Sequence, residues 1–273
     1  AQQVGMKASH LLPAKTSFAE MGDYKQDSEY FILECDEFDR TFLSYKPYVS
    51  LISGVDYDHP DIYSTRSDYQ QAFRDYINQS GHTILWQMDS TALQVTPSDS
   101  VTVLPDNESS LNELRLFGLV NRRDAWLVIQ AINRLTQHPI SDLIAHMNKF
   151  PGISRRFEKI TDHVYSDYAH TPEKIRGAIQ MAHEIADNNV VVIYEGLHNT
   201  RQHFIKEDLF NLFDSVKKLY VVPSYLARED ESLDLLTPSD IVRMTSQPNK
   251  GVATDKNENL KQIIITHQQA GDL

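Results

Sequence analysis

Hydrophobic and polar positions in the first half of the chain form blocks that predict strands alternating with helices. Short apolar runs predict strands at 30–35, 48–53 and 82–86, and the first of them has the pattern of a buried strand. Apolar side chains spaced three and four residues apart predict helices at 66–79 and 121–135. The stretch 89–118 is polar and punctuated by Pro, Ser and Asn, which indicates small strands and turns. Strands that alternate with helices favour a parallel α/β sheet.

The alternation restarts after Phe150, Pro151 and Gly152, so we expect a domain boundary there. The pattern beyond it predicts strands at 163–167, 189–194, 219–223 and 261–266 and helices at 172–187, 203–217 and 237–244. The sequence therefore predicts an α/β protein with two domains, residues 1–150 and 151–273, of which the second is a doubly wound unit.

The stretch 164–175 organises the second domain, because it reads as a strand, a polar turn and a helix start. Thr171 suits the helix N-cap and Pro172 suits the first helical position, where a missing N–H is tolerated. We expect Asp167 and His170 at the carboxyl end of the strand, where open α/β sheets bind ligands.

The composition of the chain argues against several classes of function. The net charge of −12 argues against nucleic-acid or anionic-membrane binding, although local Arg residues or helix ends can still hold a phosphate. The single cysteine, Cys35, excludes an internal disulfide and fits a reducing cytoplasm. No apolar run suggests a membrane span, so we expect a cytoplasmic protein with no membrane partner.

Acidic side chains and one histidine follow two predicted strands. Glu34, Asp36 and Glu37 come just after the first strand, and His59 comes after the second. Carboxylates with an imidazole at the mouth of a parallel sheet suit a divalent cation, Mg²⁺ by its oxygen preference or Mn²⁺ by the histidine. A solvated acidic loop is the alternative interpretation.

Three further polar groups mark other loop and helix ends. Asn121 opens a predicted helix, where it could simply be an N-cap. Arg155 and Arg156 are adjacent in an extended segment, so at most one of them faces a given ligand; a solvated linker is the alternative. His198 and Arg201 lie between a strand and a helix, where Arg201 could simply cap or shield the helix end.

The string from Asp167 to Pro172, Asp-Tyr-Ala-His-Thr-Pro, resembles the C-terminal signature of the Mur ligases, ATP-dependent enzymes that add amino acids to the peptidoglycan precursor. Other strings resemble that family in order: 34–43, 54–61, 152–158 and 194–201. Within the family they are most similar to the branch that adds L-alanine to UDP-N-acetylmuramate. The Arg-Arg-Phe-Glu string at 155–158 is also similar to ligases that recycle murein peptides.

The resemblance implies a fold and a set of roles. The fold is the latter part of a central ATP-binding α/β domain followed by a Rossmann-like C-terminal Mur ligase domain. The implied partners are ATP, Mg²⁺ or Mn²⁺, UDP-N-acetylmuramate and L-alanine. The implied roles are metal ligation by Glu34 and His59, adenine contact by Asn121, nucleotide contact by Arg156 or Arg155, ribose binding by Asp167, reactant positioning by His170, and contact with the incoming amino acid by Arg201 and His198.

The chain also departs from the family pattern. Val120 stands where the family has His, and His198 stands where it has Arg. No Gly-x-x-x-x-Gly-Lys-Ser/Thr loop occurs and the chain begins at Ala1, so we expect a fragment that does not turn over by itself. Three alternatives stay open: a murein-peptide recycling ligase, a catalytically silent binding or scaffold protein of this family, and a generic nucleotide-binding module.

Overall fold

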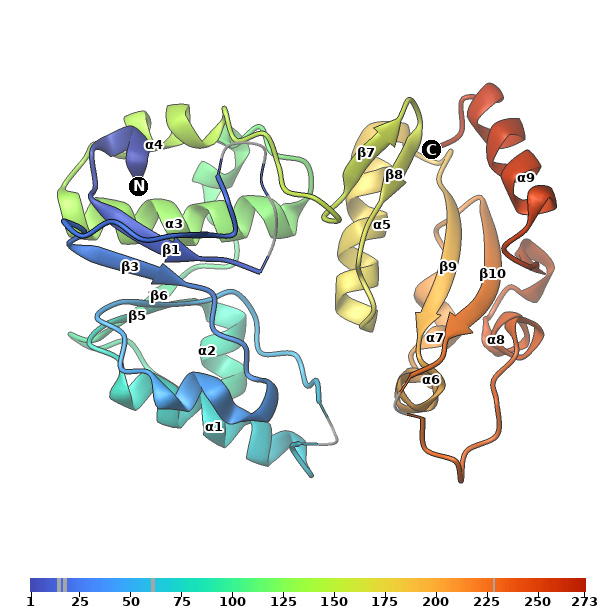
Figure 1. Cartoon of the computed structure of the whole chain (residues 1–273), viewed down its shortest axis with the longest axis horizontal. Coiled ribbons are helices and arrows are strands. Elements are labelled where there is room, and N and C mark those ends of the chain that lie inside the picture. Colours follow the sequence, from blue (N-terminus) through green and yellow to red (C-terminus); the bar gives the residue numbers. More distant parts are fainter. Residues whose placement is uncertain (14–15, 17–18, 60–61, 228) are drawn as a thin grey trace. The chain divides into compact units, whose positions relative to one another are not determined.

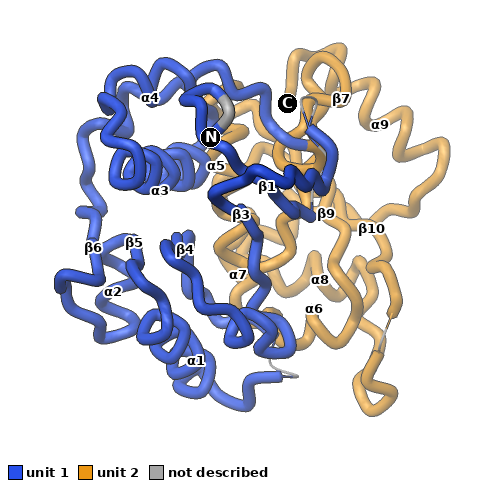
Figure 2. Tube along the Cα trace, turned by 60° about the vertical axis from the view of Figure 1, so that its left-hand side comes forward, with its two compact units in different colours: residues 1–153 blue, residues 154–273 orange. Residues whose placement is uncertain are grey.

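The computed structural model describes residues 1–273 except 14–15, 17–18, 60–61 and 228. The chain forms two compact units, Ala1–Ile153 and Ser154–Leu273, coloured blue and orange in Figure 2. Among the described residues, no helix is long and apolar enough to cross a membrane.

Unit 1 contains two small sheets and the helices around them (Figure 1). Its elements, in chain order, are η1 (Gln2–Val4), β1 (Ala8–Leu11), β2 (Gly22–Asp23), β3 (Tyr30–Leu33), η2 (Phe38–Ser44), β4 (Ser50–Ile52), α1 (Arg66–Gln79), β5 (Thr83–Trp86), α2 (Gln87–Leu93), β6 (Val101–Leu104), η3 (Ser109–Glu113), α3 (Leu119–Thr136) and α4 (Ile140–Met147). The parallel sheet has the order β4-β5-β6, and the second sheet, β2-β1-β3, pairs β1 parallel to β3 and antiparallel to β2.

The central strand β5 explains why the β4-β5-β6 sheet is stable. All four of its residues are buried, as expected for a parallel strand covered on both faces. Leu85 points into a core cluster with side chains of α1 and α2, whereas Ile84 and Trp86 point into a second cluster with α3 and α4. Because successive side chains of a strand point to opposite faces of the sheet, β5 contributes side chains to two separate core clusters.

Two sequence predictions for unit 1 need correction. The apolar strand at 30–35 forms as β3, but it is not buried: Phe31 is 59% and Ile32 42% exposed among the described residues. Residues 89–118 contain a small strand, β6, as predicted, but they also contain the end of the helix α2, which the pattern does not predict.

Unit 2 is a three-stranded parallel sheet, ordered β11-β10-β9, with an antiparallel hairpin, β7-β8. Its elements are β7 (Glu158–Thr161), β8 (Val164–Ser166), α5 (Pro172–Ala186), β9 (Val191–Leu197), α6 (Asn199–Ile205), α7 (Leu209–Leu212), β10 (Lys218–Tyr225), α8 (Pro238–Met244), η4 (Pro248–Lys250), β11 (Gly251–Ala253) and α9 (Glu258–Gln269). Its core gathers side chains of α5, α6, α7 and α8 on the inward positions of β9 and β10, such as Tyr194 and Val221.

The structure contradicts three predictions in unit 2. The strand at 163–167 forms as β8, but it pairs only with β7 among the described strands and is not part of the parallel sheet. The segment 261–266 is helical within α9; its Ile-rich run favours a strand, but the Asn257 side chain caps a helix by accepting the N–H groups of Asn259 and Leu260. The single helix expected at 203–217 is broken into α6 and α7.

Candidate functional site

The acidic loop of unit 1 gathers three side chains that can hold a metal ion. Asp36, Glu37 and His59 place their ligand atoms within 4.8 Å of one another. His59 Nε2 lies 3.7 Å from Glu37 Oε1 and 3.9 Å from Asp58 Oδ2. Two carboxylates with an imidazole form a donor set that suits Mg²⁺ or Mn²⁺.

Two buried tyrosines fix Glu37 in this group. Tyr63 donates its hydroxyl to the Glu37 carbonyl at 2.6 Å, and Tyr69 donates to Glu37 Oε1 at 3.3 Å. Burial raises the pKa of Tyr63 to about 12 and also raises that of Tyr69, so both phenols keep their protons and act as donors. Two tyrosines of the buried aromatic core therefore hold Glu37 in the acidic cluster through hydrogen bonds.

His59 reaches the cluster through an unusual backbone conformation. Its φ is 55°, and its N–H donates to Asp58 Oδ1 at 2.8 Å. The ring of Phe38 packs edge-on against the imidazole with centroids 5.0 Å apart. Pro60 and Asp61, which close the family-like string 54–61, lie outside the described residues.

Glu34, predicted as a metal ligand, is exposed directly after β3, where its N–H donates to the Leu11 carbonyl. It is not part of the three-residue cluster found among the described residues. Asp36 and Glu37 come two and three positions later, and the structure brings these carboxylates to His59 instead. Ligation by Glu34 stays a prediction.

A buried carboxylate that sequence reasoning missed lies at the start of α2. Asp89 is 6% exposed and accepts the Val55 N–H at 3.2 Å. Burial raises the pKa of Asp89 to about 6, and the Val55 N–H offsets part of that effect. An Asp in a short polar segment carries no sequence signal of this kind.

Asn121 is the third residue of α3, which begins at Leu119, so it is not the N-cap; Gly118 is. Its side-chain amide donates to the Phe117 carbonyl at 2.8 Å. Arg123, two positions later, lies over the ring of Trp86 at 5.4 Å and donates to the Asp106 carbonyl at 3.2 Å. The helix start therefore presents an amide and a stacked guanidinium near the carboxyl end of β5.

In unit 2, Asp167 ties the β8–α5 turn to the segment before β7. Its two carboxylate oxygens accept the N–H groups of Phe157 and Ala169, each at 2.7 Å. Each oxygen keeps a lone pair for a further donor such as a sugar hydroxyl. Asp167 therefore shapes this turn, and ribose binding by it stays a prediction.

Arg155 and His170 meet at the ring of Tyr168. The Arg155 guanidinium lies 4.4 Å from the ring centroid, and the imidazole packs edge-on at 5.2 Å. His170 Nδ1 lies 2.9 Å from the Tyr168 carbonyl, which can only accept, so Nδ1 carries a proton and Nε2 is the nitrogen able to accept one. Arg156 is exposed next to this group.

Thr171 occupies the N-cap position of α5 as predicted, with Pro172 at the first turn, but its hydroxyl makes no cap hydrogen bond. The hydroxyl is buried and has no partner among the described residues. The turn geometry points it inward, which a capping pattern in the sequence does not reveal.

His198 and Arg201 lie on the turn from β9 into α6. His198 is the N-cap residue with φ 32°, and its Nδ1 is buried. Arg201 lies in the first turn of α6 and is half-buried. Both belong to the carboxyl edge of the β11-β10-β9 sheet, where α/β folds place ligands.

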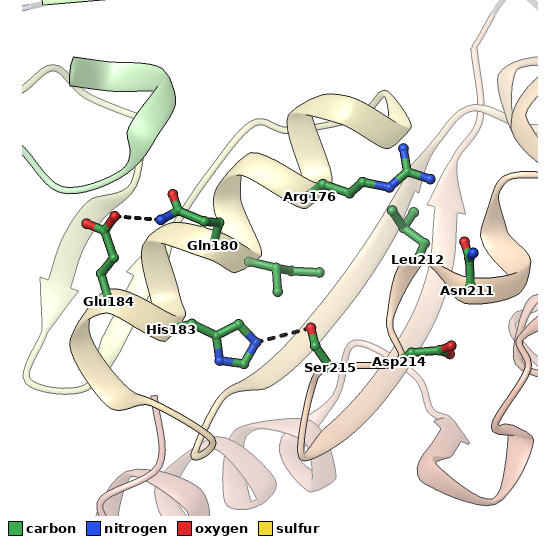
Figure 3. Close-up of a pocket in the computed structure, with 9 residues that line it drawn as sticks. Arg176, Gln180, His183, Glu184, Asn211, Leu212, Asp214 and Ser215 are labelled. Carbon is green, nitrogen blue, oxygen red and sulfur yellow. Dashed lines mark hydrogen bonds between the residues drawn. The ribbon is translucent and has the colours of Figure 1, made fainter. Parts of the chain in front are cut away.

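A groove of about 490 Å³ lies elsewhere on unit 2, between α5 and the α7 segment (Figure 3). Two of its lining residues are in contact, since His183 Nε2 lies 3.1 Å from Ser215 Oγ. None of the residues predicted to be functional lines this groove. We therefore assign it no part in the chemistry.

No family model matches the chain. Over 97% of its length it is 28% identical to a protein named UDP-N-acetylmuramate--L-alanine ligase from Lactobacillus helveticus, of which it covers 69%. Its fold is similar to UDP-N-acetylmuramate-alanine ligase from Thermotoga maritima, with a TM-score of 0.69 and 17% identity over 99% of this chain and 69% of that one. It is also similar to a murein peptide ligase from Psychrobacter arcticus, with a TM-score of 0.60 and 21% identity over 99% of this chain and 68% of that one.

The chain spans 64% to 69% of the length of the curated relatives it matches first. Both solved structures share its α/β architecture with parallel sheets. The sequence relatives and the fold agree with the resemblance carried by the string 167–172. The chain is thus similar to the Mur ligases both in sequence and in fold.

Proposed function

We propose that the natural polypeptide is an ATP-dependent ligase that joins L-alanine to the carboxyl group of UDP-N-acetylmuramate. The observation that carries the proposal is the similarity to ligases of that name over 97% of this chain. The acidic cluster with His59 and the turn with Arg201 support the proposal, because they would hold a divalent cation and the carboxylate of the amino acid.

The reaction would take two steps. A carboxylate oxygen of the muramoyl group attacks the γ-phosphorus of ATP, an acyl phosphate forms, and ADP leaves. The amine nitrogen of L-alanine then attacks the acyl carbon, phosphate leaves through a tetrahedral intermediate, and the nitrogen loses a proton as the amide forms. The protein's task is to hold both reactants and to stabilise negative charge on the phosphate and the oxyanion.

Unit 1 would hold the nucleotide side of this chemistry. His59, Asp36 and Glu37 form a donor set that fits Mg²⁺ or Mn²⁺, with Glu34 as a further proposed ligand. A cation bound there neutralises charge on phosphate oxygens. Asn121 is proposed to contact the adenine. We assign residues 1–150 to the latter part of the central ATP-binding domain.

Unit 2 would hold the rest of the nucleotide and the amine substrate. We assign residues 151–273 to the C-terminal domain, in which Asp167 binds the ribose hydroxyls and Arg156 reaches the nucleotide. Arg156 is the better candidate of the pair, because the Arg155 guanidinium already packs on Tyr168. Arg201 would bind the amino-acid carboxylate with His198 beside it, and His170 would position the reactants.

The test is an assay of the natural full-length polypeptide for ADP formation with ATP, Mg²⁺, UDP-N-acetylmuramate and L-alanine. We expect ADP formation that depends on both the sugar nucleotide and the amine. Preference for a murein tripeptide over L-alanine in a competition assay would favour a recycling ligase. Absence of both nucleotide binding and turnover would overturn the proposal in favour of a silent member of the family.

A further inference from the structure

The loop between β10 and α8 is fastened to the start of α6 by the side chain of Glu229. Glu229 Oε1 accepts the N–H of Asn199 at 3.2 Å, and Oε2 accepts the N–H of Thr200 at 2.9 Å. The Thr200 hydroxyl also lies 3.3 Å from Oε2, and the N–H of Ala227 donates to Oε1 at 2.9 Å. Both carboxylate oxygens are therefore used, by donors from two different segments.

Two residues of α6 bind the same loop in return. The buried Asn199 donates its amide to the Asp234 carbonyl at 3.0 Å and accepts the Leu236 N–H at 2.8 Å. The Thr200 hydroxyl accepts the Asp230 N–H at 2.8 Å. Long-range pairs of this kind replace the backbone pairing that an irregular loop lacks.

The negative charge of Glu229 is favourable next to the N-terminus of α6. Its carboxylate meets the first N–H groups of α6, where a helix leaves donors unpaired and favours negative charge. Burial by itself raises the pKa of Glu229, but the N–H donors at the α6 start and in its own loop hold it below the ordinary value. The carboxylate is thus charged at neutral pH and binds most strongly in that form.

The turn that this contact holds is strained and carries the residues proposed for the amine substrate. His198, the N-cap residue, has φ 32°, which side-chain-bearing residues rarely adopt, and Arg201 follows within one turn. Gly196, just before it, is packed so tightly that an added Cβ would lie 2.4 Å from Gln202 Cδ. Such a turn keeps its conformation only when its surroundings impose it.

We propose that Glu229 is a positioning residue that fixes the β9–α6 turn and thereby orients Arg201 toward the carboxylate of the amine substrate. This inference rests on the proposed ligase function. It predicts that the charge and both oxygens of Glu229 govern amine affinity, while ATP and the sugar nucleotide are bound elsewhere.

The experiment compares E229Q and E229D in the natural full-length polypeptide with E231Q as the matched control. Glu231 is an exposed glutamate two positions along the same loop. Gln keeps only one acceptor oxygen, so we expect the KM for L-alanine to rise about tenfold or more, in line with a lost charge-assisted hydrogen bond. We expect less than about twofold change in the KM for ATP, and partial recovery in E229D.

Hydrogen exchange read by mass spectrometry provides a second readout that does not need turnover. We expect faster exchange of the amides of residues 199–201 in E229Q than in E231Q, with unchanged exchange in α5. Equal exchange in the two variants, or an unchanged KM for L-alanine in an active E229Q enzyme, would overturn the positioning role. An inactive unsubstituted enzyme would overturn the proposed function and the role in amine binding with it, whereas the exchange difference would still identify the contact.

Discussion

Asp89 gives unit 1 a stability that depends on pH. Its pKa is raised from 3.8 to about 6 by burial, so between those values the folded state binds more protons than the unfolded state. Stability therefore falls as pH rises through this window, by about 3 kcal/mol in all for a shift of about two units. D89N removes the ionisation while its amide oxygen can still accept the Val55 N–H.

We expect D89N to be more stable than the unsubstituted protein at pH 8, and the gap to shrink by on the order of 1 kcal/mol at pH 5. Urea unfolding followed by tryptophan fluorescence measures this in unit 1 alone, because the chain has two tryptophans, Trp86 and Trp126, and both lie there. The control is D99N, at an exposed aspartate. A gap that does not change with pH would contradict the effect.

The metal cluster allows a direct comparison of two neighbouring glutamates. Glu37 is within reach of His59, and Glu34 is not part of that group. We expect E37Q to weaken Mn²⁺ binding about tenfold or more and E34Q to weaken it less, as measured by titration calorimetry on this chain. The opposite order would return Glu34 to the role of main ligand, as the family resemblance predicts.

The sequence locates the acidic cluster but not the atoms that meet in it. The motif at 34–43 places several carboxylates after β3, and any of them could turn toward His59. Which of them does depends on local backbone angles, such as the positive φ values of Asp39, Arg40 and His59. Residues other than Gly adopt such angles rarely, and spacing along the chain does not reveal which residues will do so.

Helices α5 and α8 both begin with a Thr-Pro pair, with Thr at the N-cap position. Only one of the two Thr side chains makes the capping hydrogen bond. Thr237 accepts the Asp240 N–H at 3.2 Å in a capping box at α8, whereas the buried Thr171 hydroxyl of α5 has no partner among the described residues. We expect T237V to destabilise α8 by about 1 kcal/mol. T171V should change the stability of α5 by less than about 0.5 kcal/mol or increase it, because it removes an unpaired buried hydroxyl.

Hydrogen exchange of peptides from α5 and α8 measures both effects in one chain, since each variant is the control for the other. Equal losses in the two helices would show that Thr171 caps α5 after all. The comparison matters for sequence reading, because both sites have the Thr-Pro pair but only α8 has an acidic residue, Asp240, at the third helical position, where α5 has Lys174.

At the level of elements, periodicity predicts long helices well and short sheet strands poorly. The helix expected at 66–79 forms as α1 with the same bounds, because five of its side chains are buried on one face. The third strand of the unit 2 sheet is β11, a three-residue segment beginning at Gly251, and no alternation of that length stands out. The Ile-rich run at 263–265 is predicted as a strand instead, although it lies in the helix α9, which Asn257 caps.

Over the whole molecule, the restart of the pattern after Gly152 coincides closely with the division into two units at Ile153 and Ser154. The pattern of hydrophobic positions does not predict which side chains pack together in the core of each unit. Unit 2 has its own core, in which Leu209, Leu219, Val221 and Ile241 are at most 2% exposed. A domain with a core of this kind has the means to fold by itself.

We therefore expect residues 154–273, produced alone, to unfold cooperatively and to give a well-dispersed amide NMR spectrum. L219A should lower the unfolding free energy of this fragment by about 2 to 5 kcal/mol, because it removes a buried side chain from the central strand β10. L235A, at a side chain that is 57% exposed, is the matched control and should change it little. A fragment with a poorly dispersed amide spectrum and a gradual thermal transition would show that the core of unit 2 is not sufficient for it to fold without the rest of the chain.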